Sequence, residues 1–136
     1  MYRLKTYLVE DSPVIRENLI AALEELAPVT VTGWADNEAT ALSWMATHDS
    51  QADLVIVDIF LKQGSGLGVL GSAQAQSNGG KVVVLTNYAT PDIRRKCLEL
   101  GADRVFDKSN EIDALFLYCQ QMARGKSGQS DAAPSP

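Results

Sequence analysis

Side chains that suit phosphoryl or metal-ion chemistry follow four short, mainly apolar runs of this sequence. The runs are 6–9 before Glu10 and Asp11, 54–57 before Asp58, 82–85 before Thr86, and 104–106 before Asp107 and Lys108. If these runs are strands lying side by side in parallel, carboxylates, a hydroxyl and an ammonium meet at one edge of a sheet. Open α/β sheets bind their ligands at that edge, outside the carboxyl ends of the strands.

The run 54–57 is the best indication that the sheet is parallel. It contains four consecutive apolar residues, three of them β-branched, which is typical of a strand buried on both faces. Asp58 therefore stands at the carboxyl end of a central strand.

Segments with helical periodicity alternate with the strands. The first is capped by Ser12, begins at Pro13 and carries Ile15, Leu19, Leu23 and Leu26 at helical spacing. A second strand over 29–34 precedes a helix that Asp36 or Asn37 caps and that runs to about Thr47, with His48 closing it. A weak third helix covers about 67–76, a turn 77–80, and a fourth helix runs from Pro91 to Leu100 behind Thr90.

The last strand covers 102–106, and Asn110 caps the last helix. Its inward residues are Ile112, Leu115, Phe116, Cys119 and Met122. Five βα units of this length predict a flavodoxin-like, doubly wound five-stranded parallel sheet of order 2-1-3-4-5 with five helices. The domain spans 1–123, and the Gly, Ser, Ala and Pro content of 124–136 predicts a disordered tail.

Composition narrows the function classes. The chain has 136 residues, 46% hydrophobic and 21% charged, with a net charge of -5, which disfavours a nucleic-acid surface. No apolar window is long enough to span a membrane and no leader pattern opens the chain, so we expect a cytoplasmic protein. Cys97 and Cys119 fall within predicted helices and are expected to be buried and reduced.

Strands 1 and 3 flank the switch point of this topology, so Glu10, Asp11 and Asp58 are expected to lie together. Carboxylates in one small space repel, and a bound cation or a nearby ammonium can keep them ionised. Oxygen ligands favour Mg²⁺, whereas Zn²⁺ prefers His or Cys, which this edge lacks. A carboxylate can also attack a phosphoryl group to give an aspartyl-phosphate.

These residues resemble the receiver domain of two-component response regulators, of the single-domain, chemotaxis-regulator-like kind, over about residues 3–123. The acidic pair is Glu10 and Asp11, the phosphoacceptor Asp58, the switch hydroxyl Thr86, and the lysine Lys108. The resemblance implies that a sensor histidine kinase or phosphotransfer protein phosphorylates Asp58. It also implies Mg²⁺ held by Asp11, Asp58 and the backbone carbonyl of Phe60, with Glu10 orienting a metal-bound water.

The resemblance further implies that the phosphoryl group draws Thr86 inward and changes the surface of the fourth helix, fifth strand and fifth helix. That surface is the candidate for homodimerisation or for an unknown downstream protein. The sequence departs from the family at Val105, where an aromatic is usual, and at Ser109, where proline is usual. Phe60 and Tyr88 occupy two positions that tune autodephosphorylation in the family, and their bulk predicts a long-lived phosphoryl group.

Two other functions remain open. One is an interaction module that keeps the fold without being phosphorylated. The other is a phosphatase with an aspartyl nucleophile, but such hydrolases usually carry a second acid two residues later, where this chain has Phe60. We therefore expect a signalling protein rather than an enzyme. Acetyl phosphate with Mg²⁺ separates the signalling protein from the interaction module, and turnover of a generic phosphomonoester tests the phosphatase.

Overall fold

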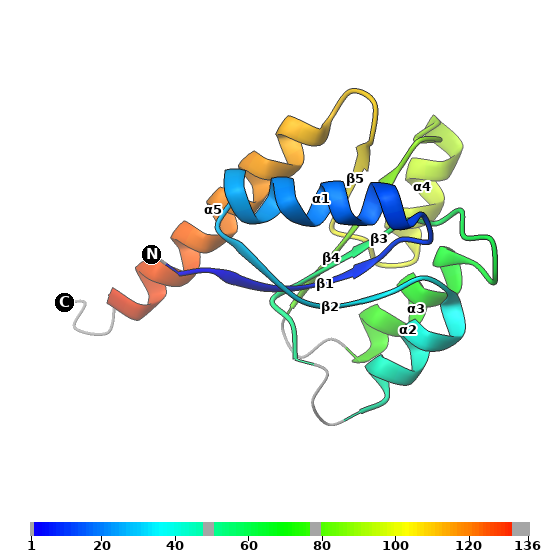
Figure 1. Cartoon of the computed structure of the whole chain (residues 1–136), viewed down its shortest axis with the longest axis horizontal. Helices are drawn as coiled ribbons and strands as arrows, with labels where there is room; N and C mark the ends of the chain where they lie inside the picture. Colours follow the sequence, from blue (N-terminus) through cyan, green and yellow to red (C-terminus); the bar gives the residue numbers. More distant parts are fainter. Residues whose placement is uncertain (1, 48–50, 77–79, 132–136) are drawn as a thin grey trace.

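Short runs of aliphatic and β-branched residues form the five strands of one parallel sheet (Figure 1). They are β1 (Leu4–Val9), β2 (Val29–Ala35), β3 (Leu54–Val57), β4 (Lys81–Thr86) and β5 (Arg104–Asp107). The strand order is β2-β1-β3-β4-β5, as predicted. This computed structural model describes residues 2–47, 51–76 and 80–131.

Of the helices in the described ranges, three start directly after predicted caps, whereas the last starts at Ile112 and not directly after the predicted cap Asn110. The helices are α1 (Pro13–Leu26), α2 (Glu38–Met45), α3 (Gly66–Gln76), α4 (Pro91–Glu99) and α5 (Ile112–Asp131). Ser12 accepts a hydrogen bond from the backbone N–H of Ile15, Asn37 from Thr40 and Thr90 from Ile93. Asn37, rather than Asp36, is thus the cap of α2.

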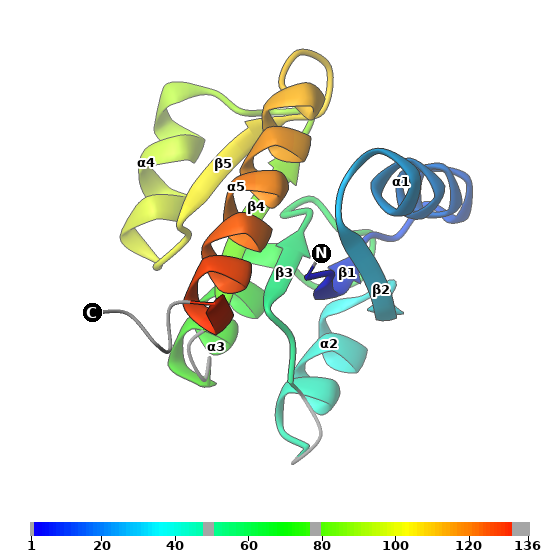
Figure 2. The same ribbon diagram turned by 90° about the vertical axis from the view of Figure 1, so that its left-hand side faces the viewer.

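Helices cover both faces of the sheet, and each face has its own core (Figures 1 and 2). On one face α2, α3 and α4 pack through Met45, Leu70 and Cys97 against alternate strand residues. On the other face α1 and α5 contribute Leu23 and Leu115. Because adjacent residues of a strand point to opposite faces, every central strand is apolar on both sides.

The buried stripe of α1 differs from the predicted one. Leu19 and Leu23 are buried as expected, but Ile15 is 39% exposed and Leu26 is 56% exposed. Arg16 takes the inner position one turn before Leu19. The buried side of α1 therefore includes the charged residue Arg16. Its guanidinium can be buried because it contacts the Glu10 carbonyl and the Trp34 ring.

Helix α5 continues to Asp131, although composition predicted a disordered tail from 124. Lys126 Nζ lies 3.3 Å from Asp53 Oδ1 and 5.6 Å from the centre of the Tyr2 ring. These contacts attach the additional turns to the start of the sheet. The helix therefore includes residues 124–131, and residues 132–136 lie outside the described chain.

Three other features bear on the predictions. Cys97 and Cys119 are buried free thiols, as expected, and burial raises the pKa of Cys119 to about 12. His48 and the turn at 77–79 lie outside the described residues. Within the described ranges, no helix has the length and apolar character needed to cross a lipid bilayer.

Candidate functional site

Two carboxylates lie side by side where β1 and β3 end. Val9 and Val57 are paired across these strands, and the backbone N–H of Asp58 donates to the Val9 carbonyl at 3.0 Å. Glu10 and Asp58 therefore follow the last paired residues, and their residues are 2% and 8% exposed. The sequence prediction that both acids reach the carboxyl edge of the sheet agrees with this placement.

Lys108 reaches the same two acids from the end of β5. Its backbone N–H donates to the Thr86 carbonyl at 2.9 Å, which holds the residue beside β4. Its ammonium nitrogen lies 2.5 Å from Glu10 Oε1 and 2.8 Å from Asp58 Oδ2. Strand ends far apart in sequence thus supply two anions and one cation to a space that is largely closed to water.

The charge state of Lys108 follows from these contacts. Burial by itself lowers the pKa of an ammonium, because it disfavours the charged form. Here the hydrogen bonds and charges of Asp58 and Glu10 outweigh burial, so the pKa of Lys108 is raised. The ammonium stays protonated and partly neutralises the two carboxylates.

Thr86 and two aromatic rings complete the surroundings of Asp58. Thr86 is fully buried, and its hydroxyl accepts a hydrogen bond from the Tyr88 backbone N–H at 3.3 Å. The Phe60 backbone N–H donates to Asp58 Oδ1 at 3.1 Å. The Phe60 and Tyr88 rings meet edge to face with centroids 4.9 Å apart, so the loops after β3 and β4 touch beside the acid.

Asp11 contacts the loop after β3 rather than Lys108. Its Oδ2 accepts from the Lys62 backbone N–H at 2.7 Å. Among the described residues no three His, Cys, Asp or Glu side chains converge in a metal-ligating arrangement, and the ammonium of Lys108 contacts both Glu10 and Asp58. Mg²⁺ typically needs only one or two carboxylates and keeps several waters, so the hard oxygen donors of Asp11 and Asp58 fit this ion.

Arg16 is a site residue that the sequence interpretation missed. Its guanidinium donates to the Glu10 carbonyl at 3.0 Å and lies 3.7 Å above the centre of the Trp34 ring. It thereby fixes the backbone of Glu10 without occupying the carboxylates. The available signal was its spacing, because Arg16 lies three and seven residues before Leu19 and Leu23 on their face of the helix.

Arg94 is a second missed residue, and it connects the two loops that carry Thr86 and Lys108. It donates to the Ala89 carbonyl at 3.0 Å, to the Val105 carbonyl at 3.1 Å and to Glu111 Oε1 at 2.6 Å. Arg94 belongs to a cluster of three basic residues at 94–96, and it joins α4 to β5 and to the start of α5.

The structure shows where Val105 and Ser109 lie, the two residues that differ from those usual in the family. Val105 packs on the α2–α3–α4 side, whereas Phe106 is buried on the α1–α5 side with its ring 5.9 Å from that of Tyr118. The two side chains therefore point to opposite faces of the sheet, as adjacent residues of a strand do. No peptide bond is cis in the part of the chain that the structure describes, and Lys108 reaches the acids with Ser109 after it.

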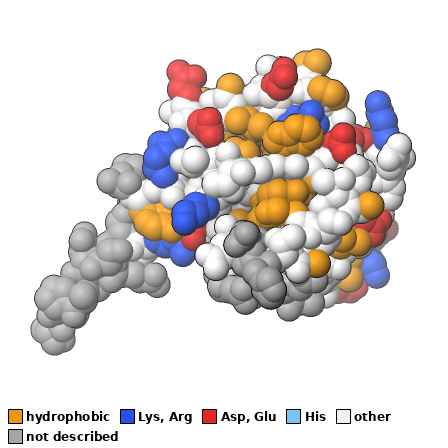
Figure 3. Space-filling model, turned by 60° about the horizontal axis from the view of Figure 1, so that its bottom comes forward, with side chains coloured by type: hydrophobic (Ala, Val, Ile, Leu, Met, Phe, Trp, Pro, Cys, Tyr) orange, Lys and Arg blue, Asp and Glu red, His pale blue; other side chains and the backbone are white. Residues whose placement is uncertain are grey.

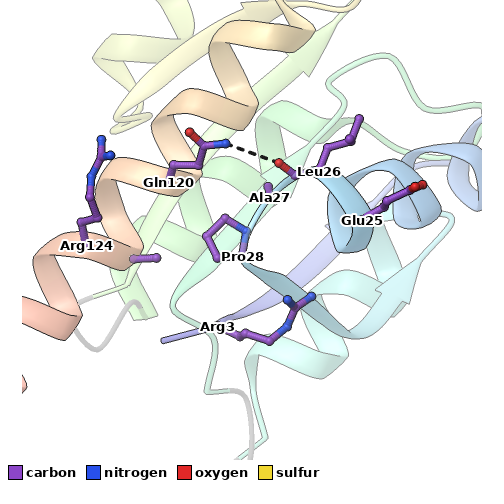
Figure 4. A pocket seen from close by; sticks show the side chains of 8 residues that line it. Arg3, Glu25, Leu26, Ala27, Pro28, Gln120 and Arg124 are labelled. Atoms are coloured by element: carbon purple, nitrogen blue, oxygen red, sulfur yellow. Dashed lines mark hydrogen bonds between the residues drawn. The ribbon is translucent and has the colours of Figure 1, made fainter. Parts of the chain in front are cut away.

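A hollow of about 560 Å³ lies at the opposite edge of the sheet, between the end of α1 and α5 (Figure 4). Arg3, Leu26 and Pro28 line it from one side and Gln120 and Arg124 from the other. Gln120 bridges it by donating to the Leu26 carbonyl at 3.4 Å. None of the acids or Lys108 takes part, so this hollow is separate from the site.

The surface seen in Figure 3 bears basic and acidic side chains interspersed with hydrophobic ones. No charge of one sign dominates that face. It therefore offers no continuous basic patch of the kind that phosphate backbones require.

Comparison with known proteins agrees with the fold. A probable transcriptional regulatory protein of Picosynechococcus is 31% identical over 127 residues, covering 90% of this chain and 50% of that protein. The Francisella response regulator 1452 receiver domain superposes with a TM-score of 0.76 at 19% identity, covering 91% of this chain and 99% of that one.

A response regulator from Burkholderia pseudomallei, solved with a phosphorylated aspartic acid, a calcium ion and citrate, gives a TM-score of 0.71. It is 24% identical and covers 97% of this chain and 75% of that one. This chain spans about half the length of the curated relatives it matches, 50% to 57% for the first three. The family model described as response regulator receiver domain matches residues 7–120, and the chain therefore belongs to that family.

Proposed function

We propose that this chain is a phosphorylation-dependent signalling switch whose acceptor is Asp58. The observation that carries the proposal is Lys108, which joins Asp58 to Glu10 beside the buried hydroxyl of Thr86. A carboxylate held by an ammonium can take a phosphoryl group whose oxygens meet that ammonium and the hydroxyl. Membership of the receiver family supports the same role.

The transfer forms one bond and breaks one. A carboxylate oxygen of Asp58 attacks phosphorus, the phosphorus–nitrogen bond of a phosphohistidine breaks, and the bonding electrons leave with the imidazole. Mg²⁺, held by Asp11, Asp58 and the Phe60 carbonyl, supplies neutralising charge for the phosphoryl oxygens when bound. Lys108 donates to one of these oxygens and Thr86 to another, while Glu10 orients water at the ion.

The partners we propose are a sensor histidine kinase or phosphotransfer protein as donor and a downstream protein as target, in the cytoplasm. The output surface, and the candidate homodimer face, is that of α4, β5 and α5. Leu98 on α4 and Leu117 on α5 are 53% and 50% exposed, so both helices present an apolar side chain to solvent. Arg94 links this surface to the loops beside Thr86 and Lys108.

Acetyl phosphate with Mg²⁺ tests the acceptor. Intact-mass measurement should show one added phosphate on the wild-type chain and none on Asp58→Asn. A matched control is Asp92→Asn, because Asp92 is an exposed acid on α4 that pairs only with Arg95 among its described contacts. An adduct that persists in Asp58→Asn would refute the assignment.

The same sample separates the two remaining functions. A chain that takes up no phosphate, with or without Mg²⁺, is an interaction module that keeps the fold. Turnover of a generic phosphomonoester that is lost in Asp58→Asn indicates a phosphatase. The edge-to-face contact of Phe60 with Tyr88 disfavours hydrolysis, because the position two residues after Asp58 carries a ring instead of a general acid.

A further inference from the structure

Glu38, the first residue of α2, holds the loop that runs from Asp58 to the start of α3. Its backbone N–H donates to the Gln63 carbonyl at 3.3 Å. Its carboxylate oxygen Oε1 accepts from the Ser65 backbone N–H at 2.8 Å. Backbone and side chain of one residue thus fix two points of the loop, on either side of Gly64.

The loop is shaped to receive this carboxylate. A Cβ at Gly68 would lie 2.1 Å from Glu38 Oε2, and one at Gly64, whose φ is +84°, would lie 2.4 Å from Glu38 Cβ. Gly64 is required by its positive φ and its contact with Glu38 Cβ, whereas a larger residue at position 68 would push the Glu38 carboxylate aside. The carboxylate also lies beside the first turns of α2 and α3, where the helix dipoles favour negative charge.

The other side of the same loop contacts the acids of the site. Gly66 donates to the Ile59 carbonyl at 3.1 Å, and a Cβ there would lie 2.2 Å from the Asp58 carbonyl oxygen. The Lys62 N–H orients Asp11 Oδ2 at 2.7 Å. Between these points lies Phe60, whose carbonyl is the proposed backbone ligand. A shift of the loop therefore displaces the Phe60 carbonyl, which is a proposed ligand, and the Lys62 N–H, which orients the proposed ligand Asp11.

We propose that Glu38 is a positioning residue for the magnesium site, which acts by holding the β3–α3 loop in its binding conformation. This inference rests on the proposed function, because it takes Asp11, Asp58 and the Phe60 carbonyl as the ligands. Glycines leave the loop little conformational preference of its own. Without Glu38, binding of Mg²⁺ has to order the loop as well, and the affinity falls.

Calorimetric titration of Mg²⁺ into the full chain tests the inference without any phosphoryl donor. Glu38→Ala should weaken Mg²⁺ binding about tenfold, the usual size for loss of a group that supports metal ligands. Glu38→Gln should lie between it and wild type, because the amide oxygen still accepts from Ser65 but carries no charge. Hydrogen exchange should show faster exchange of the Ser65 amide in metal-free Glu38→Ala.

Glu24→Ala is the matched control. Glu24 Oε2 also accepts a backbone N–H, that of Val31 at 2.9 Å, but it does so between α1 and β2, away from the loop. Its removal costs a comparable hydrogen bond, so Mg²⁺ affinity should stay at the wild-type value. A loss shared equally by Glu24→Ala and Glu38→Ala would reduce Glu38 to general stability and overturn the proposal.

Gly68→Ala tests the same contact from the other side. In the wild-type background the added methyl collides with Glu38 Oε2, so Mg²⁺ binding should weaken. In the Glu38→Ala background the collision is absent, so the same change should cost nothing more. Additive losses would contradict the proposal.

The possible failures are distinguishable. If wild type and Glu24→Ala bind Mg²⁺ and Glu38→Ala binds it equally well, the role of Glu38 is refuted while the proposed function stands. If wild type binds no Mg²⁺, the metal site of the proposed function fails, and the inference about Glu38 falls with it.

Discussion

Lys108 Nζ lies 2.8 Å from Asp58 Oδ2, an ion pair that joins the end of β5 to the end of β3 across the intervening β4. The pair is largely closed to water, with side-chain exposures of 12% and 11%. Glu10 is drawn into the same contact. One cation therefore balances two buried anions, so its removal has consequences for stability.

Lys108→Met should destabilise the metal-free protein by about 3 kcal/mol, the usual cost of leaving a buried charge without its partner. Urea denaturation with and without Mg²⁺ measures this loss. Mg²⁺ should restore part of it by binding near the two carboxylates that no longer have a cation between them. Lys81→Met is the control, because Lys81 lies 3.9 Å from Asp103 at a surface where it is 53% exposed. Its loss should cost about 0.5 kcal/mol, and equal effects would contradict the prediction.

Phe60→Ala and Tyr88→Ala should each shorten the lifetime of the phosphoryl group on Asp58. The two rings contact each other, and both belong to loops that follow β3 and β4. If they limit the approach of water to a phosphoryl group on Asp58, removing either ring opens that approach. Intact-mass measurement of phosphoprotein decay in Mg²⁺ buffer gives the rates. Leu117→Ala on α5, equally exposed but remote in the fold, should decay as wild type does. Wild-type decay within seconds would refute the shielding role.

Acid should weaken the connection between α4 and α5 through Glu111. Hydrogen bonds from Arg94 and from the Asp107 backbone N–H lower the pKa of Glu111 below its ordinary 4.5. Ionised Glu111 therefore stabilises the fold above that value, and the contribution is lost as the pH falls through the lowered pKa. Thermal unfolding from pH 7 to pH 3 should show Glu111→Gln less stable at neutral pH, with the difference from wild type vanishing in acid. A pH-independent difference would contradict this origin.

The last turns of α5 should contribute to stability through Lys126. Its ion pair with Asp53 is supported by the Tyr2 hydroxyl, which donates to Asp53 Oδ2 at 2.9 Å. Lys126→Met should lower the midpoint of thermal unfolding by a few degrees, and a chain ending at residue 123 should lose at least as much. Arg124→Met, an exposed neighbour on the same helix, is the control. An unchanged midpoint in both Lys126→Met and the shortened chain would mean that the last turns of α5 add nothing to stability.

The strand-end acids, Thr86 and Lys108 could be predicted from sequence because apolar strands are easy to recognise and parallel topology brings their ends together. Arg16 and Glu38 could not be assigned their roles this way. Arg16 bonds a backbone carbonyl and Glu38 a backbone N–H of a distant loop, and neither contact leaves a motif. The end of α5 was missed for the opposite reason: its local composition disfavours helix, and its contact through Lys126 with Asp53 is made to a distant part of the chain.

Gly66 illustrates how strictly the site constrains its neighbours. No side chain fits between its Cα and the carbonyl of Asp58, whereas a methyl at Gly71, further along the same helix, would meet no atom within 4 Å. A library of random replacements selected for phosphate uptake should keep glycine at position 66 and let position 71 vary. Two glycines of one helix would then tolerate mutation very differently, because only Gly66 lies against the backbone of Asp58.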